Sequence, residues 1–285
     1  MSTQITTAFV QQYKDNVMHL AQQNGSRLRA CVTEEAVTGE SVLFDLIGQT
    51  AAQKRTTRHG DTPLVETPHT RRKCILADYE WADLIDQQDR VRLLGDPKSD
   101  YVLAGGMAMG RAMDDVIIAA FNATAITGKD GSGTATLPSG QKISAAAAGL
   151  TIAKLRAADK ALNKGEVEKE ERFIVTTAEQ IEDLLATTEV TSSDYNTVKA
   201  LKQGEIDTFL GFKFIHSERL PLDGSGNRLC FAWQRRGIRL GVGLDMVTRI
   251  DERSDKSYAT QIYVAQTIGA VRMEEARVVE IACVE

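Results

Sequence analysis

The chain has 285 residues, 42% of them hydrophobic and 26% charged, and a formal net charge of −5 at pH 7. This length supports a full hydrophobic core in one large or two moderate domains, and no apolar run approaches the roughly 18 residues of a membrane helix. The negative charge argues against a general nucleic-acid-binding protein, because such proteins concentrate Lys and Arg against phosphates. The N-terminus, MSTQITTAFVQQYKDN, has no secretory signal pattern, so we expect a soluble cytoplasmic protein.

The N-terminal region predicts one helix and one strand. Four apolar residues recur at helical spacing and predict an amphipathic helix: Phe9, Tyr13, Val17 and Leu20. The polar NGS at 24–26 ends this helix. Residues 40–50, ESVLFDLIGQT, then predict a short apolar strand.

A long polar hairpin is predicted next. Residues 51–73 are strongly polar, and GDTPLVETP in their middle supplies Gly60, Pro63 and Pro68 as turn residues. Each flank can alternate as a strand, but the hairpin has little apolar content. Because an isolated two-stranded ribbon is marginal in water, this hairpin must rest on something else.

Charge is unevenly distributed around this hairpin. Residues 53–73 carry six cations and two carboxylates, a net charge of +4, which leaves −9 for the remainder. The cations are Lys54, Arg55, Arg58, Arg71, Arg72 and Lys73. An acidic run follows at once, formed by Asp78, Glu80, Asp83, Asp86 and Asp89. A basic and an acidic segment are thus adjacent in sequence.

A single long helix is predicted over residues 97–127. Asp96-Pro97 is a good helix start, small and apolar residues recur at spacings of three and four, and Gly128 stops the helix. The stretch contains Gly105, Gly106 and Gly110, whose spacing does not fit a dinucleotide-binding loop. Since an interior glycine costs about 1 kcal/mol relative to Ala, we expect another backbone to pack closely against these three glycines.

The remainder of the chain alternates types and then becomes β-rich. Residues 128–144 predict a loop or loose hairpin, and a compact α/β domain follows. Its predicted elements are a helix at 144–165, a buried strand RFIVTT at 172–177, helices at 178–189 and 194–205, and a strand ending in a turn at 209–221. From Arg228 onward the pattern is mainly β.

No motif predicts a catalytic or cofactor site. A Walker A loop, a G-x-S-x-G elbow and an H-E-x-x-H helix are all missing from the sequence. Asp114 and Asp115 are adjacent on a helix and point to different faces, so we expect them to pair with Arg111 on the helix surface. Of the histidines away from the hairpin, His19 and His216 are interpreted as packed or surface residues.

Metal binding has only one candidate. Four residues flank the hairpin tip and carry suitable donors: His59, Asp61, Glu66 and His69. A solvent-facing tip provides no supporting shell of hydrogen bonds, so we predict no metal and keep this site as the alternative. Four cysteines lie tens of residues apart and are expected to be free, mostly buried thiols: Cys31, Cys74, Cys230 and Cys283.

The order of elements resembles that of the tailed-bacteriophage major capsid proteins of the Hong Kong 97-like fold family. DPKSDYVLAGGMAMGRAMDDVIIAAFNATA resembles the spine helix of that family, and KALKQGEIDTFLGFKFIHSERLP resembles the stretch before its last strands. The resemblance covers nearly the whole chain. The chain differs from the self-scaffolded members of the family in lacking a long helical pre-segment, so any scaffold is expected to be a separate protein.

This resemblance implies an α+β fold with five parts. They are an N-terminal arm at 1–48, an extended β-hairpin or E-loop at 49–76, a peripheral domain at 77–149 with the spine helix at 97–127, an axial α/β domain at 150–225, and C-terminal strands at 226–285 that return to the peripheral domain. The basic hairpin is then expected to contact a neighbouring subunit, with Asp83, Asp86 and Asp89 in the receiving surface.

The implied function is that of a non-enzymatic major capsid protein that self-assembles into an icosahedral head around the DNA genome. Hexamers and pentamers of this chain, a portal and decoration proteins are the implied partners, DNA is enclosed without sequence-specific binding, and assembly takes place in the host bacterial cytoplasm. Two alternatives stay open. One is an encapsulin-like compartment, and the other is a metal-dependent enzyme that uses the hairpin tip.

Overall fold

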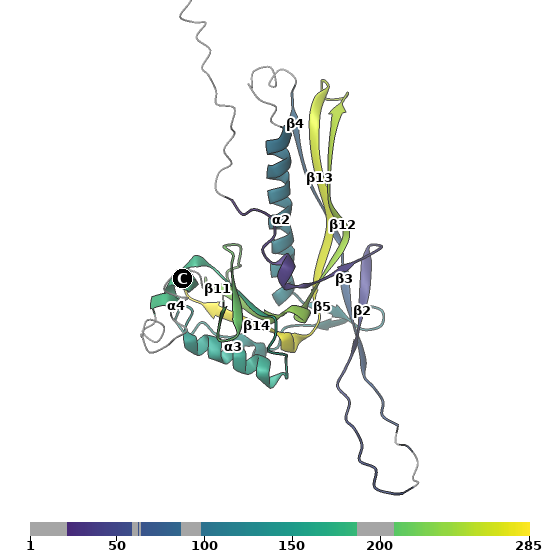
Figure 1. The fold of residues 1–285 in the computed structure, drawn as a ribbon, viewed down its shortest axis with the longest axis vertical. Coiled ribbons are helices and arrows are strands. Elements are labelled where there is room, and N and C mark those ends of the chain that lie inside the picture. The colour runs from purple at the N-terminus through teal and green to yellow at the C-terminus, as the bar shows by residue number, and fades with distance from the viewer. Residues whose placement is uncertain (1–21, 59–61, 63, 87–97, 187–207) are drawn as a thin grey trace, which may run out of the picture. The chain divides into compact units, whose positions relative to one another are not determined.

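The computed structural model describes residues 22–58, 62, 64–86, 98–186 and 208–285 (Figure 1). The chain divides into two compact units. Unit 1 comprises Met1–Ser26, Asp78–Ala112 and Leu244–Thr267, and unit 2 comprises Arg27–Ala77, Met113–Gly243 and Ile268–Glu285. Among the described residues, no helix is both long and apolar enough to cross a membrane.

Unit 1 combines the first part of a long helix with long strands. It contains the first part of helix α2 (Lys98–Asn122) and parts of the strands of a sheet of order β1-β12-β13-β4. In this sheet β1 is Thr33–Ala36, β4 is Ala77–Ile85, β12 is Ile238–Arg253 and β13 is Ala259–Arg272, and β1 belongs to unit 2. Buried and half-buried residues alternate along β13, as expected for a strand with one covered face. Gln266 on the buried face donates to the Met109 carbonyl of α2 over 2.9 Å.

Unit 2 contains a six-stranded mixed sheet of order β7-β14-β11-β8-β10-β9. The strands are β7 (Lys142–Ile143), β14 (Val278–Cys283), β11 (Arg228–Gln234), β8 (Arg172–Thr176), β10 (Phe212–His216) and β9 (Thr208–Phe209). Every residue of β8 and β14 is buried, which confirms the buried strand predicted from RFIVTT. Helices α3 (Ile152–Lys164) and α4 (Ala178–Ala186) belong to the same unit.

An aromatic cluster forms the centre of this unit. The ring of Trp233 lies 4.7 Å from that of Phe121 and 5.8 Å from that of Phe173, and Phe121 stacks on Phe231 at 4.9 Å. Trp233 is fully buried and donates its indole N–H to the carbonyl of Cys31 over 2.9 Å. The indole therefore contributes apolar area without leaving its donor unsatisfied.

A second sheet of unit 2 has the order β2-β3-β5-β6. Strands β2 (Ser41–Ile47) and β3 (His69–Ile75) pair antiparallel along their full length, and β3 also pairs with β5 (Ala125–Thr127), which pairs with β6 (Gly133–Ala135). Phe44, Cys74 and Met273 pack in its core. This confirms the strand predicted near residues 40–50 and the loose hairpin after residue 128.

The long helix exists as predicted but ends earlier. It stops at Asn122, and the residues expected to be its last turn form β5. The guanidinium of Arg272 donates to the carbonyls of Phe121 and Ala123, over 2.7 and 2.8 Å, and to that of Ala135 over 3.0 Å. A cation placed on unpaired C-terminal carbonyls ends the helix favourably, so a distant residue sets the boundary that Gly128 was expected to set.

Other boundaries also differ from the prediction. The helix expected from residue 144 begins at Ile152, because Ala146 and Ala147 have φ values of 48° and 52°. The strand expected at 209–221 is a short hairpin, in which Leu210 and Gly211 have positive φ between β9 and β10. The helices expected at 9–20 and 194–205, and the Asp96-Pro97 start, lie outside the described residues.

The C-terminal strands divide between sheets. Only β12 and β13 extend into unit 1, whereas β11 and β14 complete the six-stranded sheet with β8 and β10. The expected boundary at 225/226, with all later strands in the peripheral domain, stays a prediction, while β11 and β14 share a sheet with β8. Strand β11 pairs with β8, and β14 pairs with β11. The pattern of a fully buried strand does not specify which neighbour it pairs with.

Arg272 gives a first testable prediction. Replacing it with Met removes five N–H donors from a fully buried site and leaves three carbonyls without this partner, so we expect a loss of about 3–5 kcal/mol in the free energy of unfolding. Urea unfolding of unassembled protein measures it. Arg236→Met is the matched control, because that side chain is 72% exposed. A loss below about 1 kcal/mol for Arg272→Met would contradict this role.

Candidate functional site

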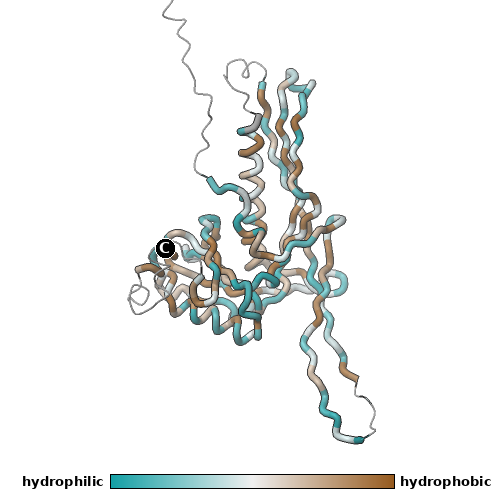
Figure 2. The backbone as a smooth tube through the Cα atoms, viewed as in Figure 1, coloured by the Kyte–Doolittle hydropathy of each residue, from teal (hydrophilic) through white to brown (hydrophobic). Residues whose placement is uncertain are grey.

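The hairpin extends beyond its paired strands. The last backbone hydrogen bond between its arms joins the Gly48 N–H to the Pro68 carbonyl over 2.8 Å. Beyond it, the described residues 49–58, 62 and 64–67 contain no strand and are all exposed. Most of these arms are coloured hydrophilic or neutral in Figure 2, yet Leu64 is 92% exposed. The hairpin is confirmed, but its strands lie at the base, and its arms have no core of their own.

The six predicted cations have different environments. Lys54, Arg55 and Arg58 are exposed on the first arm. Arg71 forms an ion pair with Asp45, directly opposite on β2, over 2.5 Å. Arg72 is buried, donating to the Met273 carbonyl over 2.9 Å and to both carboxylate oxygens of Glu275 over 2.7 and 2.8 Å.

Arg72 thus stabilises the interior of unit 2, and its expected contact with another subunit stays a prediction. Its burial follows from the register of β3, which turns Arg72 and Cys74 toward the same covered face. The sequence could not distinguish Arg72 from its neighbours, because three consecutive cations hide the alternation of a strand. Lys73, on the other face, is half-buried.

A basic pocket of about 500 Å³ opens at the base of the hairpin. Residues at the start of β3 and at the β5–β6 turn line it: His69, Thr70, Arg71, Arg72, Thr127, Gly128 and Lys129. Three of these are permanent cations, and Asp45 and Glu275 pair with two of them. The exposed Lys129 adds a further positive charge, so the wall of the pocket is positive overall. Such a wall favours binding of a carboxylate over binding of a cation.

Two residues of the acidic run that follows the hairpin, Asp78 and Glu80, already have hydrogen-bond partners within unit 1. Asp78 accepts a hydrogen bond from Thr267 over 2.6 Å, and Glu80 accepts one from Tyr263 over 2.7 Å, so both are tied to β13. The Glu80 carboxylate raises the pKa of the Tyr263 hydroxyl. Asp83 and Asp86 are exposed, and Asp89 lies outside the described residues. The exposed acids that remain for an external contact are therefore Asp83 and Asp86.

The three helix glycines have three different surroundings. A Cβ on Gly110 would lie 2.4 Å from the carbonyl carbon of Gly25 and 2.8 Å from the Ser26 nitrogen, so a backbone does pack there. A Cβ on Gly105 would lie 2.7 Å from the Trp81 ring. Around Gly106 nothing lies nearer than the Met246 sulfur, at 3.8 Å. Within the chain, a backbone therefore lies against Gly110, side chains lie against Gly105, and Gly106 has room for a methyl group.

The two adjacent aspartates have partners other than the expected Arg111. Asp114 is fully buried and accepts from the backbone N–H groups of Arg27 and Leu28, each over 3.1 Å. Asp115 forms an ion pair with Arg219. Arg111 donates to Gln22 over 2.8 Å. These aspartates fasten other segments to the helix, a role that helix periodicity alone does not reveal.

Comparison with known proteins assigns the chain to a family. A family model described as phage capsid protein matches residues 5–285. The chain belongs to this family. Among solved structures, the capsid of the cyanophage P-SCSP1u superposes with a TM-score of 0.77 at 16% identity, covering 99% of this chain and 95% of that one. No curated protein matches the sequence.

Two further capsid structures share the fold of this capsid protein. That of Mycobacterium phage Che8 has a TM-score of 0.72 at 16% identity and covers 96% of this chain and 97% of its own. That of Ralstonia phage GP4 has a TM-score of 0.73 at 11% identity and covers 97% and 95%. The resemblance to phage capsid proteins is thereby confirmed, and the protein is a structural component of the virion capsid.

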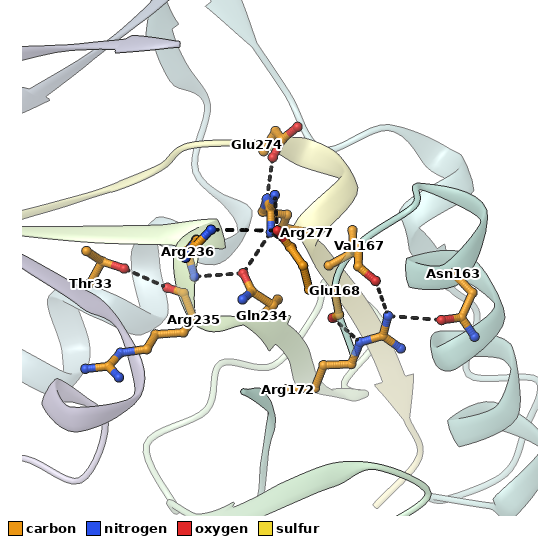
Figure 3. Close-up of polar contacts among 10 residues, drawn as sticks. All are labelled: Thr33, Asn163, Val167, Glu168, Arg172, Gln234, Arg235, Arg236, Glu274 and Arg277. Carbon is orange, nitrogen blue, oxygen red and sulfur yellow. Dashed lines mark hydrogen bonds and ion pairs between the residues drawn. The ribbon is translucent and has the colours of Figure 1, made fainter. Parts of the chain in front are cut away.

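Figure 3 shows the polar network that fixes one corner of unit 2 in this capsid protein. Arg277 pairs with Glu168 and Glu274 and donates to Gln234 over 2.9 Å. Arg172 donates to the Val167 and Glu168 carbonyls over 2.5 and 2.8 Å, and to Asn163 over 3.0 Å. The hydrogen bond from Arg277 lowers the pKa of Glu168. Acceptors within the fold occupy these donors, so the cluster holds the end of α3 beside the start of β8 and links the end of β11 to the residue before β14.

The described residues with metal chemistry do not converge, whereas two thiols, those of Cys230 on β11 and Cys283 on β14, share a hydrogen bond. All four cysteines are free and buried, as predicted, and burial raises the pKa of the Cys74 thiol to about 11. No three His, Cys, Asp or Glu residues within the described ranges are placed to hold a metal. Of the tip residues, Glu66 and His69 are exposed, and His59 and Asp61 lie outside the described residues. The tip hypothesis is therefore not tested by the structure.

Proposed function

We propose that this capsid protein self-assembles, as hexamers and pentamers, into the closed icosahedral head of a tailed phage that encloses the DNA genome. The exposed hairpin arms carry this proposal. Segments 49–58 and 64–67 contain no strand and expose Leu64. The isolated chain therefore provides no packing partner that would stabilise one conformation of these arms. Contact with a neighbouring copy supplies the missing partner.

A second surface supports repeated contact between copies. Residues 244–253 of β12 are exposed throughout, including Leu244, Met246 and Ile250 at 44–50%. Strand β1 (Thr33–Ala36) pairs with β12 only at Arg239–Val242, and β13 is the neighbour on the other side. An exposed strand edge with apolar side chains is a template for association. We infer that a neighbouring subunit covers it.

The charge distribution is consistent with a container for DNA. A net charge of −5 disfavours tight binding of the enclosed phosphates. Lys54, Arg55 and Arg58 are exposed on the hairpin, where an acidic surface of another subunit can meet them. Scaffolding, portal and decoration proteins are separate chains in this proposal. Assembly takes place in the host cytoplasm, and the protein performs no catalysis.

Electron microscopy of the purified protein tests this function. We expect closed shells of uniform size, or irregular polymers of the same subunit where a separate scaffold is missing. A protein that stays monomeric at high concentration and carries a stoichiometric metal would contradict the proposal and favour the enzyme that uses His59 and His69. Shells that package a protein cargo and no DNA in the native host would favour the encapsulin-like alternative.

A further inference from the structure

A histidine and an arginine meet where the N-terminal segment enters unit 2. Arg27 is the first residue of this unit, and His216 is the last residue of β10. One guanidinium nitrogen of Arg27, Nη1, lies 2.9 Å from Nδ1 of His216 and donates to the His216 carbonyl over 2.7 Å. On the other side of the ring, Nε2 lies 2.7 Å from a carboxylate oxygen of Glu218.

These partners define which imidazole nitrogen carries the proton. Arginine has donors only, so Nδ1 must act as the acceptor and cannot be protonated. An ionised carboxylate has acceptors only, so Nε2 must carry the hydrogen and donate it to Glu218. The same Glu218 oxygen accepts the N–H of Ala178, the first residue of α4, over 2.8 Å, which fixes the carboxylate in place. These partners therefore place the ring hydrogen on Nε2 and leave Nδ1 as the acceptor for Arg27.

The other charged groups nearby are already engaged. Asp114 of α2 accepts the backbone N–H groups of Arg27 and Leu28, and Asp115 pairs with Arg219, one residue beyond Glu218. The remaining cation on β10 is Lys213, three residues before His216. His216 thus faces one carboxylate, Glu218, and one cation, Arg27. The side chain is 41% exposed, so water can deliver a proton to it.

We propose that the contact between Arg27 and His216 is a pH-dependent latch. It fastens residues 22–31, here called the root of the N-terminal segment. Protonation at Nδ1 replaces an acceptor with a donor, so two N–H groups and two positive charges face each other. Glu218 retains the imidazolium as its ion-pair partner, and the Arg27 side chain leaves. The backbone N–H groups of Arg27 and Leu28 are then held by Asp114 without the help of the Arg27 side chain, so they open more often while unit 2 stays folded. This latch depends on the local geometry and not on the proposed shell.

Hydrogen–deuterium exchange of the full chain tests the latch. Peptides covering residues 22–31 are followed by mass spectrometry at pH 7.5 and 5.0, with rates corrected for intrinsic exchange. We expect protection to fall about tenfold at the lower pH, as for loss of a hydrogen bond to a charged group. In His216→Asn the amide oxygen can accept from Arg27 but cannot titrate, so protection should be independent of pH. Arg27→Gln should also lose the pH dependence, with lower protection already at pH 7.5.

Two outcomes would overturn the proposal. One is an unchanged protection between the two pH values in the wild type. The other is a pH dependence in His216→Asn equal to that of the wild type, since another group would then be responsible. Nitrogen-15 NMR of histidine-labelled wild-type protein provides a test that needs no variant to fold. It should show the proton on Nε2 at pH 7.5, and a proton on Nδ1 at that pH would exclude the latch.

Discussion

Gly110→Ala is expected to destabilise unit 1 by about 2–3 kcal/mol, although alanine is the better helix former. The new methyl group would lie 2.4 Å from the carbonyl carbon of Gly25, and a backbone cannot rotate away as a flexible side chain can. The gain in helix propensity, about 1 kcal/mol, is smaller than this overlap. Urea unfolding of the unassembled protein measures the loss, and electron microscopy shows whether the variant still forms shells.

Gly106→Ala is the matched control, four residues away on the same helix. No atom outside the neighbouring helix backbone lies within 3.8 Å of its Cβ position, so the propensity gain should remain and stabilise the protein by up to about 1 kcal/mol. The two variants therefore change stability in opposite directions. Equal effects of the two substitutions would show that close backbone packing is not the reason for Gly110.

Reversal of three hairpin charges should block shell formation and leave the fold intact. Lys54, Arg55 and Arg58 are exposed, and none forms an ion pair within the described residues, so replacing all three with Glu removes no ion pair of this kind. A single exposed ion pair contributes roughly 0–1 kcal/mol, but a closed shell repeats the contact in every subunit. We expect an unchanged circular dichroism spectrum, no shells by electron microscopy, and weaker wild-type assembly at high salt.

Two further variants sharpen this experiment. Arg72→Glu should lower the free energy of unfolding by about 3 kcal/mol or more, because it places a carboxylate beside Glu275 in a buried site. This loss would distinguish an interior cation from the exposed cations of the hairpin. Adding Asp83→Lys and Asp86→Lys to the triple variant should partly restore shells if this acidic surface is the receiver. Normal particles from the triple variant alone would show that the hairpin cations make no contact that matters to assembly.

The sequence predicted well those features that depend on local pattern. The alternation and length of apolar runs identified β2 and β8, the spacing of small residues identified α2, and the polar content of residues 51–73 identified a hairpin without its own core. Hydrophobicity is a property of the side chains themselves, and its period along the chain predicts which face of an element is buried. The order of these elements was also sufficient to indicate the capsid family, which the match over residues 5–285 confirmed.

The tertiary structure decided which residue of a similar set has which role. Arg71, Arg72 and Lys73 look alike in sequence, yet only Arg72 is turned toward the interior, where Glu275, 203 residues later, binds it. Likewise Arg272 ends α2 from 149 residues away, and Asp114 binds the backbone of residues 27 and 28. These partners are distant in sequence, and contact between distant residues depends on strand register and packing, which a local pattern does not contain.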